Sequence, residues 1–267
     1  MILDNQIIDH FQKKILDRYV LHARDLPWRK TTDPYKIWVS ESMLCQTQVS
    51  RVIEYYHRWM ELFPTVQSLA TASNEDLLRA RSGLGYNSRA LRLKQAAIHI
   101  AAMEAFPSDY QSLIQLPWIG EYIANAVLAF AYNQDVVVID TNIRRIMIHE
   151  FDLPHDVGKD LLRSIVLQTL PKGQSRIWYN ALMDYGALEL TAQKTGIKPL
   201  NKQSKFHGST RQVRAGIVRS LLQSVWWCLS YADIAGLYTD REDLDEIITK
   251  MAKDGLILAN GKVISIA

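Results

Sequence analysis

The sequence has few cysteines, and this scarcity excludes several kinds of site. Cys45 and Cys228 are the only two among 267 residues. Two thiolates cannot complete a four-cysteine zinc site or an iron–sulfur cluster, each of which takes four ligands. A disulfide between the two is also disfavoured, because nothing else in the sequence indicates an oxidising compartment.

Long apolar runs and a targeting segment are missing too. No run reaches the roughly 20 apolar residues that a membrane-spanning helix needs. The first 20 residues mix both charges and lack the basic start, apolar centre and small-residue end of a signal peptide. We therefore expect a cytoplasmic protein without membrane contact.

A strong excess of charge of either sign is absent as well. The formal net charge is +3, which is compatible with nucleic acid but does not by itself indicate it. The hydrophobic share of 48% is ordinary for a globular protein. The length allows one large or two modest domains, each with a core of its own.

The spacing of apolar residues predicts helices over most of the chain. Residues 6–22 and 35–61 carry apolar positions at helical intervals, the second run with room for one break. Residues 194–210 are polar and basic and contain Gly and Pro, which is typical of a linker. We therefore expect an all-α fold with a main body over 1–193, a linker over 194–210 and a separate part over 211–267.

The last part has the pattern of a small winged-helix unit. Three amphipathic segments precede two apolar runs around Asn260-Gly261, a pair typical of a tight hairpin. Winged-helix units often bind DNA through their third helix. Here the third segment begins with five acids between residues 240 and 246, which argues against phosphate contact along its first half. A docking or packing role is at least as well supported.

Two carboxylates are candidates for chemistry. Glu41 falls on the apolar side of a predicted helix, where a carboxylate is costly unless it is paired or functional. The alternative is that it faces water at the helix edge, or pairs with Arg29 or Arg51. Asp140 follows the apolar run VVVI and precedes a helix, so it is either a helix N-cap or a carboxylate beside a reaction centre. Glycosidic cleavage uses two carboxyl groups in different surroundings, one protonated and one ionised.

A turn in LPWIGEYIANAV (116–127) is a third candidate. Its Pro and Gly open a helix and expose backbone N–H groups at the helix N-terminus, an arrangement that binds phosphate. A plain tight turn between two helices explains the same residues.

Seven segments in this order carry a family resemblance: LPWR (26–29), DPYKIWVSESMLCQTQV (33–49), FPTV (63–66), GLGYNSRA (83–90), LPWIGEYIANAV (116–127), VVVIDTNIRRI (136–146) and ALMDYGA (181–187). They resemble the helix-hairpin-helix (HhH-GPD) superfamily of DNA glycosylases, specifically its MutY-type adenine mismatch glycosylases. The segment GSTRQVRAGIV (208–218) is similar to the short C-terminal extension of some members. The resemblance implies a two-lobed helix-hairpin-helix body with the winged-helix-like unit after it.

The resemblance also implies a role for each of five catalytic residues. Glu41 matches the acid that protonates a purine ring nitrogen, and Asp140 the carboxylate that stabilises the oxocarbenium-like sugar. Asn142 matches the residue that orients this Asp, and Arg29 one near Glu41 and the target base. Tyr122 stands where relatives such as endonuclease III carry a Schiff-base Lys, and without an amine we expect no efficient strand cleavage.

DNA contacts are implied by the same motifs. The glycosidic bond is hidden within a duplex, so the target base has to be flipped out, and Gln46 and Tyr86 match residues that wedge into the stack. The full set of expected DNA-binding positions is Leu44, Gln46, Tyr86, Ser88, Arg89, Trp118, Ile119 and Gly120.

The chain departs from the family pattern at several positions. Leu190 stands where the first ligand of the usual iron–sulfur cluster would be, and no Cys follows it before residue 228, so we expect no cluster. The basic linker is expected to make the DNA contacts of that loop, through Lys194, Lys198, Lys202 and Lys205. Trp118 replaces a hairpin Gly and is expensive if the position needs a positive φ. Cys45 and Thr141 replace a Gln and a Gly. The only cofactor that the resemblance leaves room for is a monovalent cation at the hairpin.

The expected function is a monofunctional DNA glycosylase of base excision repair, which removes adenine opposite guanine or 8-oxoguanine. The larger C-terminal domain with which many members read 8-oxoguanine is missing, which leaves the opposite base open. Two alternatives remain: excision of thymine or uracil opposite guanine, and a DNA-binding protein without catalysis. The expected partner is duplex DNA with a mismatched or damaged base, bound by a monomer associated with the nucleoid.

Overall fold

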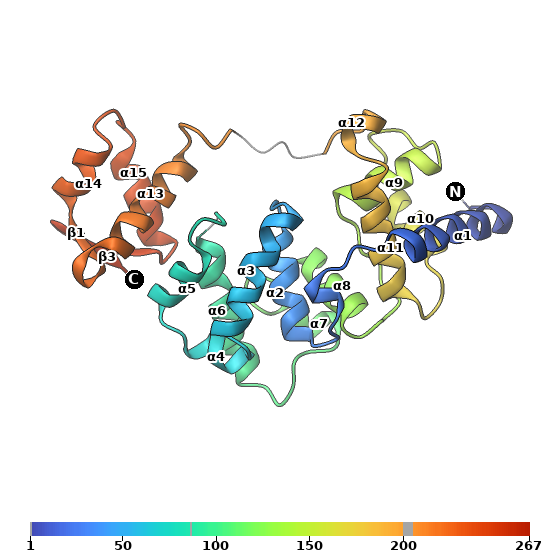
Figure 1. Cartoon of the computed structure of the whole chain (residues 1–267), viewed down its shortest axis with the longest axis horizontal. Coiled ribbons are helices and arrows are strands. Elements are labelled where there is room, and N and C mark those ends of the chain that lie inside the picture. Colours follow the sequence, from blue (N-terminus) through green and yellow to red (C-terminus); the bar gives the residue numbers. More distant parts are fainter. Residues whose placement is uncertain (1, 86, 200–204) are drawn as a thin grey trace. The chain divides into compact units, whose positions relative to one another are not determined.

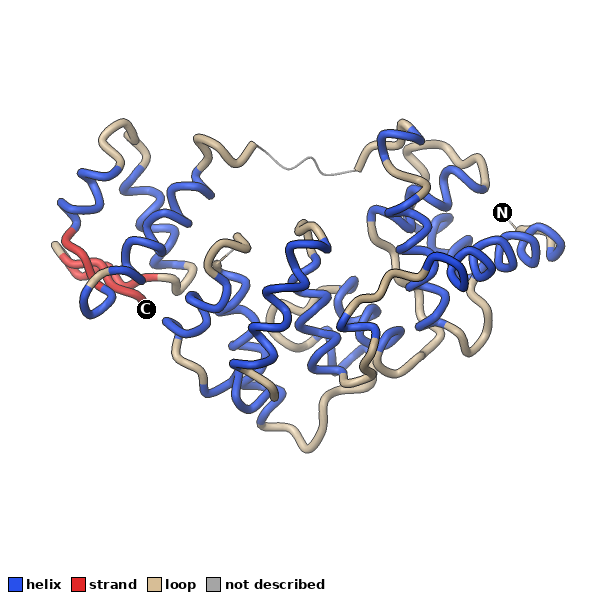
Figure 2. The backbone as a smooth tube through the Cα atoms, viewed as in Figure 1, coloured by secondary structure: helices blue, strands red, loops and turns tan. Residues whose placement is uncertain are grey.

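The computed structural model describes residues 2–85, 87–199 and 205–267. This part of the chain is mostly helical, with one small sheet close to the C-terminal end, drawn in red in Figure 2. It forms two compact units. The first contains the described residues of 1–41, 107–115 and 119–202, and the second those of 42–106, 116–118 and 203–267.

Helix α11 is the centre of the first unit (Figure 1). It packs against α1, α9 and α8. Phe11 of α1 meets Phe151 and Trp178 edge to face, with ring centroids 5.1 and 5.6 Å away. The helices of this unit are α1 (Asn5–His22), η1 (Pro27–Arg29), α2 (Pro34–Leu44, whose last turn belongs to the second unit), α7 (Tyr110–Ile114), α8 (Glu121–Phe130), α9 (Thr141–Glu150), α10 (Lys159–Thr169), α11 (Ser175–Leu188) and α12 (Ala192–Thr195).

The second unit contains α3 (Val49–Leu62), α4 (Val66–Thr71), α5 (Asn74–Arg81) and α6 (Ser88–Ala101), followed much later in the chain by the C-terminal elements. Those are α13 (Thr210–Gln223), η2 (Val225–Trp227), β1 (Cys228–Ser230), α14 (Tyr231–Leu237), α15 (Leu244–Lys253), β2 (Ile257–Asn260) and β3 (Val263–Ile266). The strands pair antiparallel in the order β1-β3-β2. Arg79 of α5 donates to the carbonyl of Leu222 in α13 over 3.1 Å, which ties the C-terminal elements to the rest of the unit.

The predicted elements are confirmed in type and order. The break in 35–61 lies between Leu44 and Val49. Ser73 caps α5, and Ser230 caps α14 through a capping box with Asp233. The turn between β2 and β3 contains Gly261 at φ 62°. The all-α, winged-helix-bearing fold is therefore confirmed, whereas the three-part domain division stays a prediction.

Across the described ranges, no helix combines the length and the apolar character needed to cross a membrane.

Candidate active site

Glu41 is a buried residue of the first unit. The middle turns of α2 are enclosed on every side, from Ile37 through Met43, and Glu41 is only 4% exposed. Tyr122 donates its hydroxyl proton to Glu41 Oε2 over 2.8 Å. The alternative of a water-facing Glu41 is therefore wrong.

The surroundings of Glu41 raise its pKa. Burial, and to a lesser extent the charge of Asp140, raises the pKa of Glu41 to about 7, against the opposing effects of Tyr122 and Arg29. A carboxyl group with this pKa keeps its proton in a large fraction of molecules at neutral pH, yet gives it up readily. The same interaction shows that Glu41 and Asp140, 99 positions apart in the chain, lie close enough to influence each other.

Asp140 is the N-cap of α9 and is held by that helix. Its Oδ1 accepts the backbone N–H of Ile143 at 2.7 Å, and its Oδ2 accepts the amide of Asn142 at 2.9 Å. Burial raises the pKa of Asp140, while these hydrogen bonds and the charge of Arg145 oppose the rise. The N-cap alternative for Asp140 is confirmed, and the cap geometry directs donors toward the carboxylate, which favours the ionised form.

Arg145 fixes the Asn142 side chain through a hydrogen bond to its amide oxygen. It is 6% exposed and donates to Asn142 Oδ1, to the carbonyl of Gly186 at 3.0 Å and to the carbonyl of Leu190. A Cβ on Gly186 would lie 2.8 Å from the Cβ of Asn142, so α11 approaches α9 here only because the residue is glycine. Arg145 and Gly186 escaped the sequence analysis, since neither carries a signal before α9 and α11 are known to meet.

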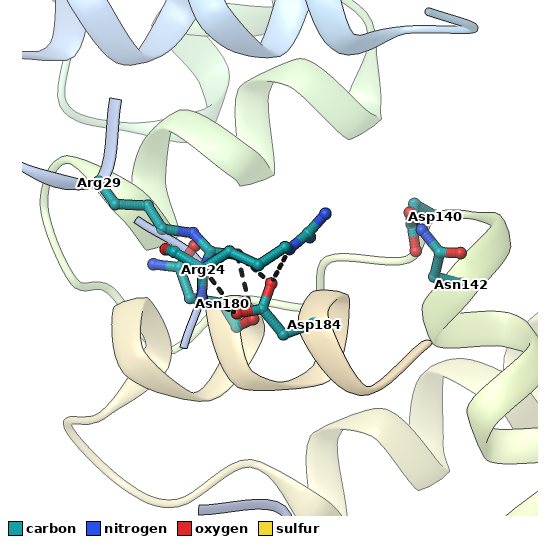
Figure 3. A network of polar contacts seen from close by, with 6 residues as sticks. All are labelled: Arg24, Arg29, Asp140, Asn142, Asn180 and Asp184. Atoms are coloured by element: carbon teal, nitrogen blue, oxygen red, sulfur yellow. Dashed lines mark hydrogen bonds and ion pairs between the residues drawn. The ribbon is translucent and has the colours of Figure 1, made fainter. Parts of the chain in front are cut away.

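Arg29 is committed to an ion pair with Asp184 of α11, as Figure 3 shows. Its two terminal nitrogens reach Asp184 Oδ2 and Oδ1 at 2.8 and 2.7 Å, and Arg24 Nε joins at 2.6 Å. Burial alone would raise the pKa of Asp184, but the hydrogen bonds and charges of both arginines bring it below its usual value. Asp184 lies inside ALMDYGA, where a lone acid in an apolar helix was the missed signal.

The alternative in which Glu41 pairs with Arg29 or Arg51 is therefore wrong. Arg29 pairs with Asp184, and Arg51 donates to the carbonyl of Gly83. Arg29 nevertheless lies beside the acid, because both line one small cavity, of about 10 Å³, together with Trp28, Phe130 and Asn180. This space holds about one water molecule.

Several expected DNA-binding positions belong to the second unit. Gln46 lies in the break between α2 and α3 at φ 60°, a conformation that costs a non-glycine residue energy. Arg89, directly after Ser88 in the first turn of α6, donates to the carbonyls of Cys45 at 2.6 Å and Ser42 at 3.4 Å, so it holds this loop from the α6 side. Leu44 ends α2. Tyr86, the second expected wedge, lies outside the described residues, as does Lys202.

Trp118 in the hairpin has the positive φ that was expected to be costly for this residue. Trp118 has φ 65°, the left-handed conformation that the Gly of the family pattern would adopt at lower cost. Its ring is 59% exposed and stacks 4.0 Å from the guanidinium of Arg92. Ile119 is buried, and Gly120 forms the N-cap of α8. Gly120 thereby begins the helix whose first turn carries Tyr122.

The first unit thus brings together Glu41, Tyr122, Asp140 and Asn142, with Arg29 at the edge. A cluster ligand set is not among the described residues, since no three His, Cys, Asp or Glu side chains group there as a metal site would require. Arg145 also occupies the carbonyl of Leu190, the residue at the expected first ligand position. The residues present do not fit an iron–sulfur cluster.

Comparison with known proteins gives a consistent result. Residues 39–170 match the family described as HhH-GPD superfamily base excision DNA repair protein. The chain is 34% identical over 271 residues to the adenine DNA glycosylase of Mycobacterium tuberculosis (strain ATCC 25618 / H37Rv), covering 91% of this chain and 88% of that protein. It is 35% identical to the Rattus norvegicus adenine DNA glycosylase, covering 69% of this chain and 39% of the relative.

Solved structures share the fold. A thermostable thymine-DNA glycosylase superposes with a TM-score of 0.64 at 23% identity, covering 72% of this chain and 94% of that one. Endonuclease III in a non-covalent DNA complex gives a TM-score of 0.63 at 18% identity, covering 74% and 91%. At these identities the likeness concerns architecture alone.

Proposed function

The chain belongs to the HhH-GPD superfamily of base excision DNA repair proteins and, within it, to the adenine DNA glycosylases, and we propose that it releases mispaired adenine from duplex DNA by hydrolysis alone. The observation that carries this proposal is the buried Glu41, whose pKa is raised to about 7, together with Asp140, whose carboxylate accepts hydrogen bonds from Asn142 and from the Ile143 N–H. One carboxyl group is then available as acid and the other as a negative charge.

The proposed reaction begins with the adenine flipped out of the duplex. Glu41 donates its proton to a ring nitrogen of the base, and the glycosidic C–N bond breaks with its electron pair leaving on the base. Asp140 stabilises the positive charge that develops on the sugar, held in place by Asn142 and the Ile143 N–H. A water molecule then adds its hydroxide to the sugar carbon, and its proton passes to a carboxylate of the site.

Tyr122 supports hydrolysis without strand cleavage. A lyase of this fold forms a Schiff base between an amine and the sugar, and a phenol cannot form one. The Tyr122 hydroxyl is instead bonded to Glu41, which orients the acid. We propose that strand breakage requires added alkali.

We also propose that the enzyme works without an iron–sulfur cluster, so that a monovalent cation at the hairpin is the only cofactor left open. The support is chemical: the whole chain has two cysteines, and a cluster takes four. Arg145 donates hydrogen bonds to Asn142 and to the carbonyls of Gly186 and Leu190. We propose that these bonds stabilise the segment around Leu190, where a cluster loop would otherwise begin.

The proposed substrate is duplex DNA with adenine opposite guanine or 8-oxoguanine, bound by a monomer at the nucleoid in the cytoplasm. The test is single-turnover base release with excess protein on labelled duplexes. The panel holds A, T, U and C opposite G, and A opposite 8-oxoguanine and C, each read with and without alkali. Release of adenine that needs alkali for scission is the expected result.

Other outcomes of the same panel contradict separate parts of the proposal. Release of thymine or uracil instead would change the substrate but keep the mechanism, and scission without alkali would contradict the role given to Tyr122. Tight binding with no release from any duplex would overturn catalysis. Light scattering of the purified chain checks the monomer.

A further inference from the structure

A groove of about 840 Å³ lies within the second unit. One wall is α13, the first helix of the C-terminal elements. The opposite wall combines the break that holds Gln46, the turn from Ser82 to Asn87 and the first turns of α6. The groove therefore joins the winged-helix-like elements to residues that the family resemblance assigns to DNA.

Positive charge dominates the lining. Its described residues include five arginines against a single acid, Asp254: Arg51, Arg92, Arg211, Arg214 and Arg219. Three of the five come from α13. Lysine is not among these described lining residues, and guanidinium groups suit phosphate better than point charges because they donate two parallel hydrogen bonds.

Arg211 and Arg219 lie on one face of the amphipathic helix α13, and Arg214 lies at the border of that face. Val213, Ile217 and Leu221 are buried on its other face against the C-terminal core. Arg211 and Arg219 are eight residues apart, which at 1.5 Å per residue separates them by about 12 Å along the axis. Two side chains at this spacing reach different groups of an extended polyanion.

Three groove arginines are already anchored by neighbours. Arg51 donates to the carbonyl of Gly83, Arg92 stacks on Trp118 and Arg214 pairs with Asp254. A guanidinium has five N–H donors, so each keeps donors for a ligand after these contacts. Anchoring also lowers the entropy lost when the ligand binds.

The helix expected to meet DNA in a winged-helix unit does not fit this role. The acids around the start of α15 remain unfavourable for phosphate, and Tyr231 bonds to one of them, Asp245. We propose that α13 takes that role instead, as one wall of a groove that binds the phosphate backbone of duplex DNA without reading its sequence. The choice of DNA as occupant rests on the proposed function.

The test measures the salt dependence of duplex binding for the double variant Arg211→Gln/Arg219→Gln. The probe is a labelled duplex of about 30 base pairs, either fully paired or with one A·G mismatch. All proteins in this test also carry Glu41→Gln, so that no base is released during the binding measurement. Each lost phosphate contact flattens the plot of log affinity against log salt by about 0.9. Two contacts reduce the slope by about 1.8, so affinity falls roughly 12-fold less between 50 and 200 mM salt than in the parent.

The matched control is Lys253→Gln/Lys262→Gln, which removes two exposed charges of the same C-terminal elements outside the groove. It should leave the slope unchanged. Asp254→Asn provides a variant with the opposite sign: it releases Arg214 and should tighten binding and steepen the slope by up to about 0.9. Misfolding does not produce tighter binding, so this variant separates a phosphate role from a structural one.

Several results would overturn the proposal. These are an unchanged slope in the arginine variant, weaker binding at unchanged slope, or an equal loss in the lysine control. An unaltered affinity for DNA would assign the groove to an acidic protein instead. Base release by the parent chain is scored separately, so a failure of the groove and a failure of the glycosylase are distinguishable.

Discussion

The two units of this protein use charged groups in opposite ways. In the first, Glu41 and Asp184 are buried and Asp140 is half-buried, and each accepts hydrogen bonds from named donors. In the second, five arginines line a groove that solvent enters. Chemistry needs the first arrangement, because desolvation shifts a pKa and strengthens local fields. Capture of a polyanion needs the second, because exposed charges exchange small ions for phosphates.

The contrast extends to the backbone. Gln46 and Trp118, both in the second unit, hold left-handed conformations that are unfavourable for their residue types. The proposed catalytic residues of the first unit instead lie in or directly before regular helices: Glu41 in α2, Tyr122 in α8 and Asp140 at the cap of α9. The reacting groups are thus placed by rigid elements, while the expected DNA contacts depend on turns.

The largest expected effect comes from Glu41→Gln. Loss of the acid should lower single-turnover base release by roughly 10³-fold, because general acid catalysis contributes about 10²–10⁴. Duplex affinity should persist. The matched control is Glu61→Gln, an exposed position on α3, which should retain full release. Near-normal release by Glu41→Gln would contradict the catalytic role of the buried carboxyl group, and with it the contrast between the two units.

Gly186→Ala should have the next largest effect. The added methyl lies 2.8 Å from the Cβ of Asn142 and pushes the residue that orients Asp140. We expect base release to fall about 100-fold, and stability by about 1–3 kcal/mol from overpacking. Rate constants and urea unfolding measure the two.

The control for that variant is Gly236→Ala in α14, where an added Cβ has no neighbour within 4 Å. It should raise stability by about 0.4–1 kcal/mol and leave release unchanged. Equal rates for the two variants would show that α11 does not position the catalytic pair.

The pH dependence of base release should report on the two carboxyl groups of the first unit. Above about pH 7 the single-turnover rate should fall about tenfold per pH unit, because Glu41 loses the proton it donates. On the acid side the rate should fall as Asp140 becomes protonated, at a pH above that of an ordinary Asp because its pKa is raised. A flat profile between pH 6 and 9, measured at saturating protein, would contradict the role of Glu41.

Glu41 should also link stability to pH. Its pKa rises from 4.5 in the unfolded chain to about 7 in the fold, so the folded state binds its proton more tightly. The resulting stabilisation is fully present below pH 4.5 and is lost as the pH rises through about 7, a change of about 3 kcal/mol. In urea titrations Glu41→Gln should remove this part of the pH dependence, and its persistence would contradict the assignment.

The smallest expected effect concerns Trp118. Trp118→Gly relieves a left-handed strain of about 1–2 kcal/mol but loses the stacking on Arg92, worth about 0.5–1 kcal/mol. The net change in unfolding free energy should therefore be a gain of between zero and about 1.5 kcal/mol. Trp118→Ala keeps the strain and loses the stacking, so it should be the less stable of the two. The reverse order would show that the hairpin does not strain Trp118.

Much of the fold followed from local patterns. Asp140 was expected as a possible helix cap and Asn260-Gly261 as a hairpin turn, and the structure has Asp140 at the N-cap of α9 and Gly261 between β2 and β3. The candidate site was only partly predictable. Glu41 and Asp140 were identified one by one, and the bond of Tyr122 to Glu41 was not expected. Arg29 was placed near the acid, but its partner Asp184, 155 positions away, was missed.

The sequence by itself determined the order of helices, their caps, the Asn260-Gly261 hairpin and the identity of the two carboxyl groups. These depend on energies between residues a few positions apart, which a linear pattern carries in full. The tertiary structure alone decided three features: the raised pKa of Glu41, the hydrogen bond from Arg145 to Asn142, and the fact that α13 lines the groove with its arginines. Each depends on which distant segments exclude water from which side chain, and that is settled only when the helices pack.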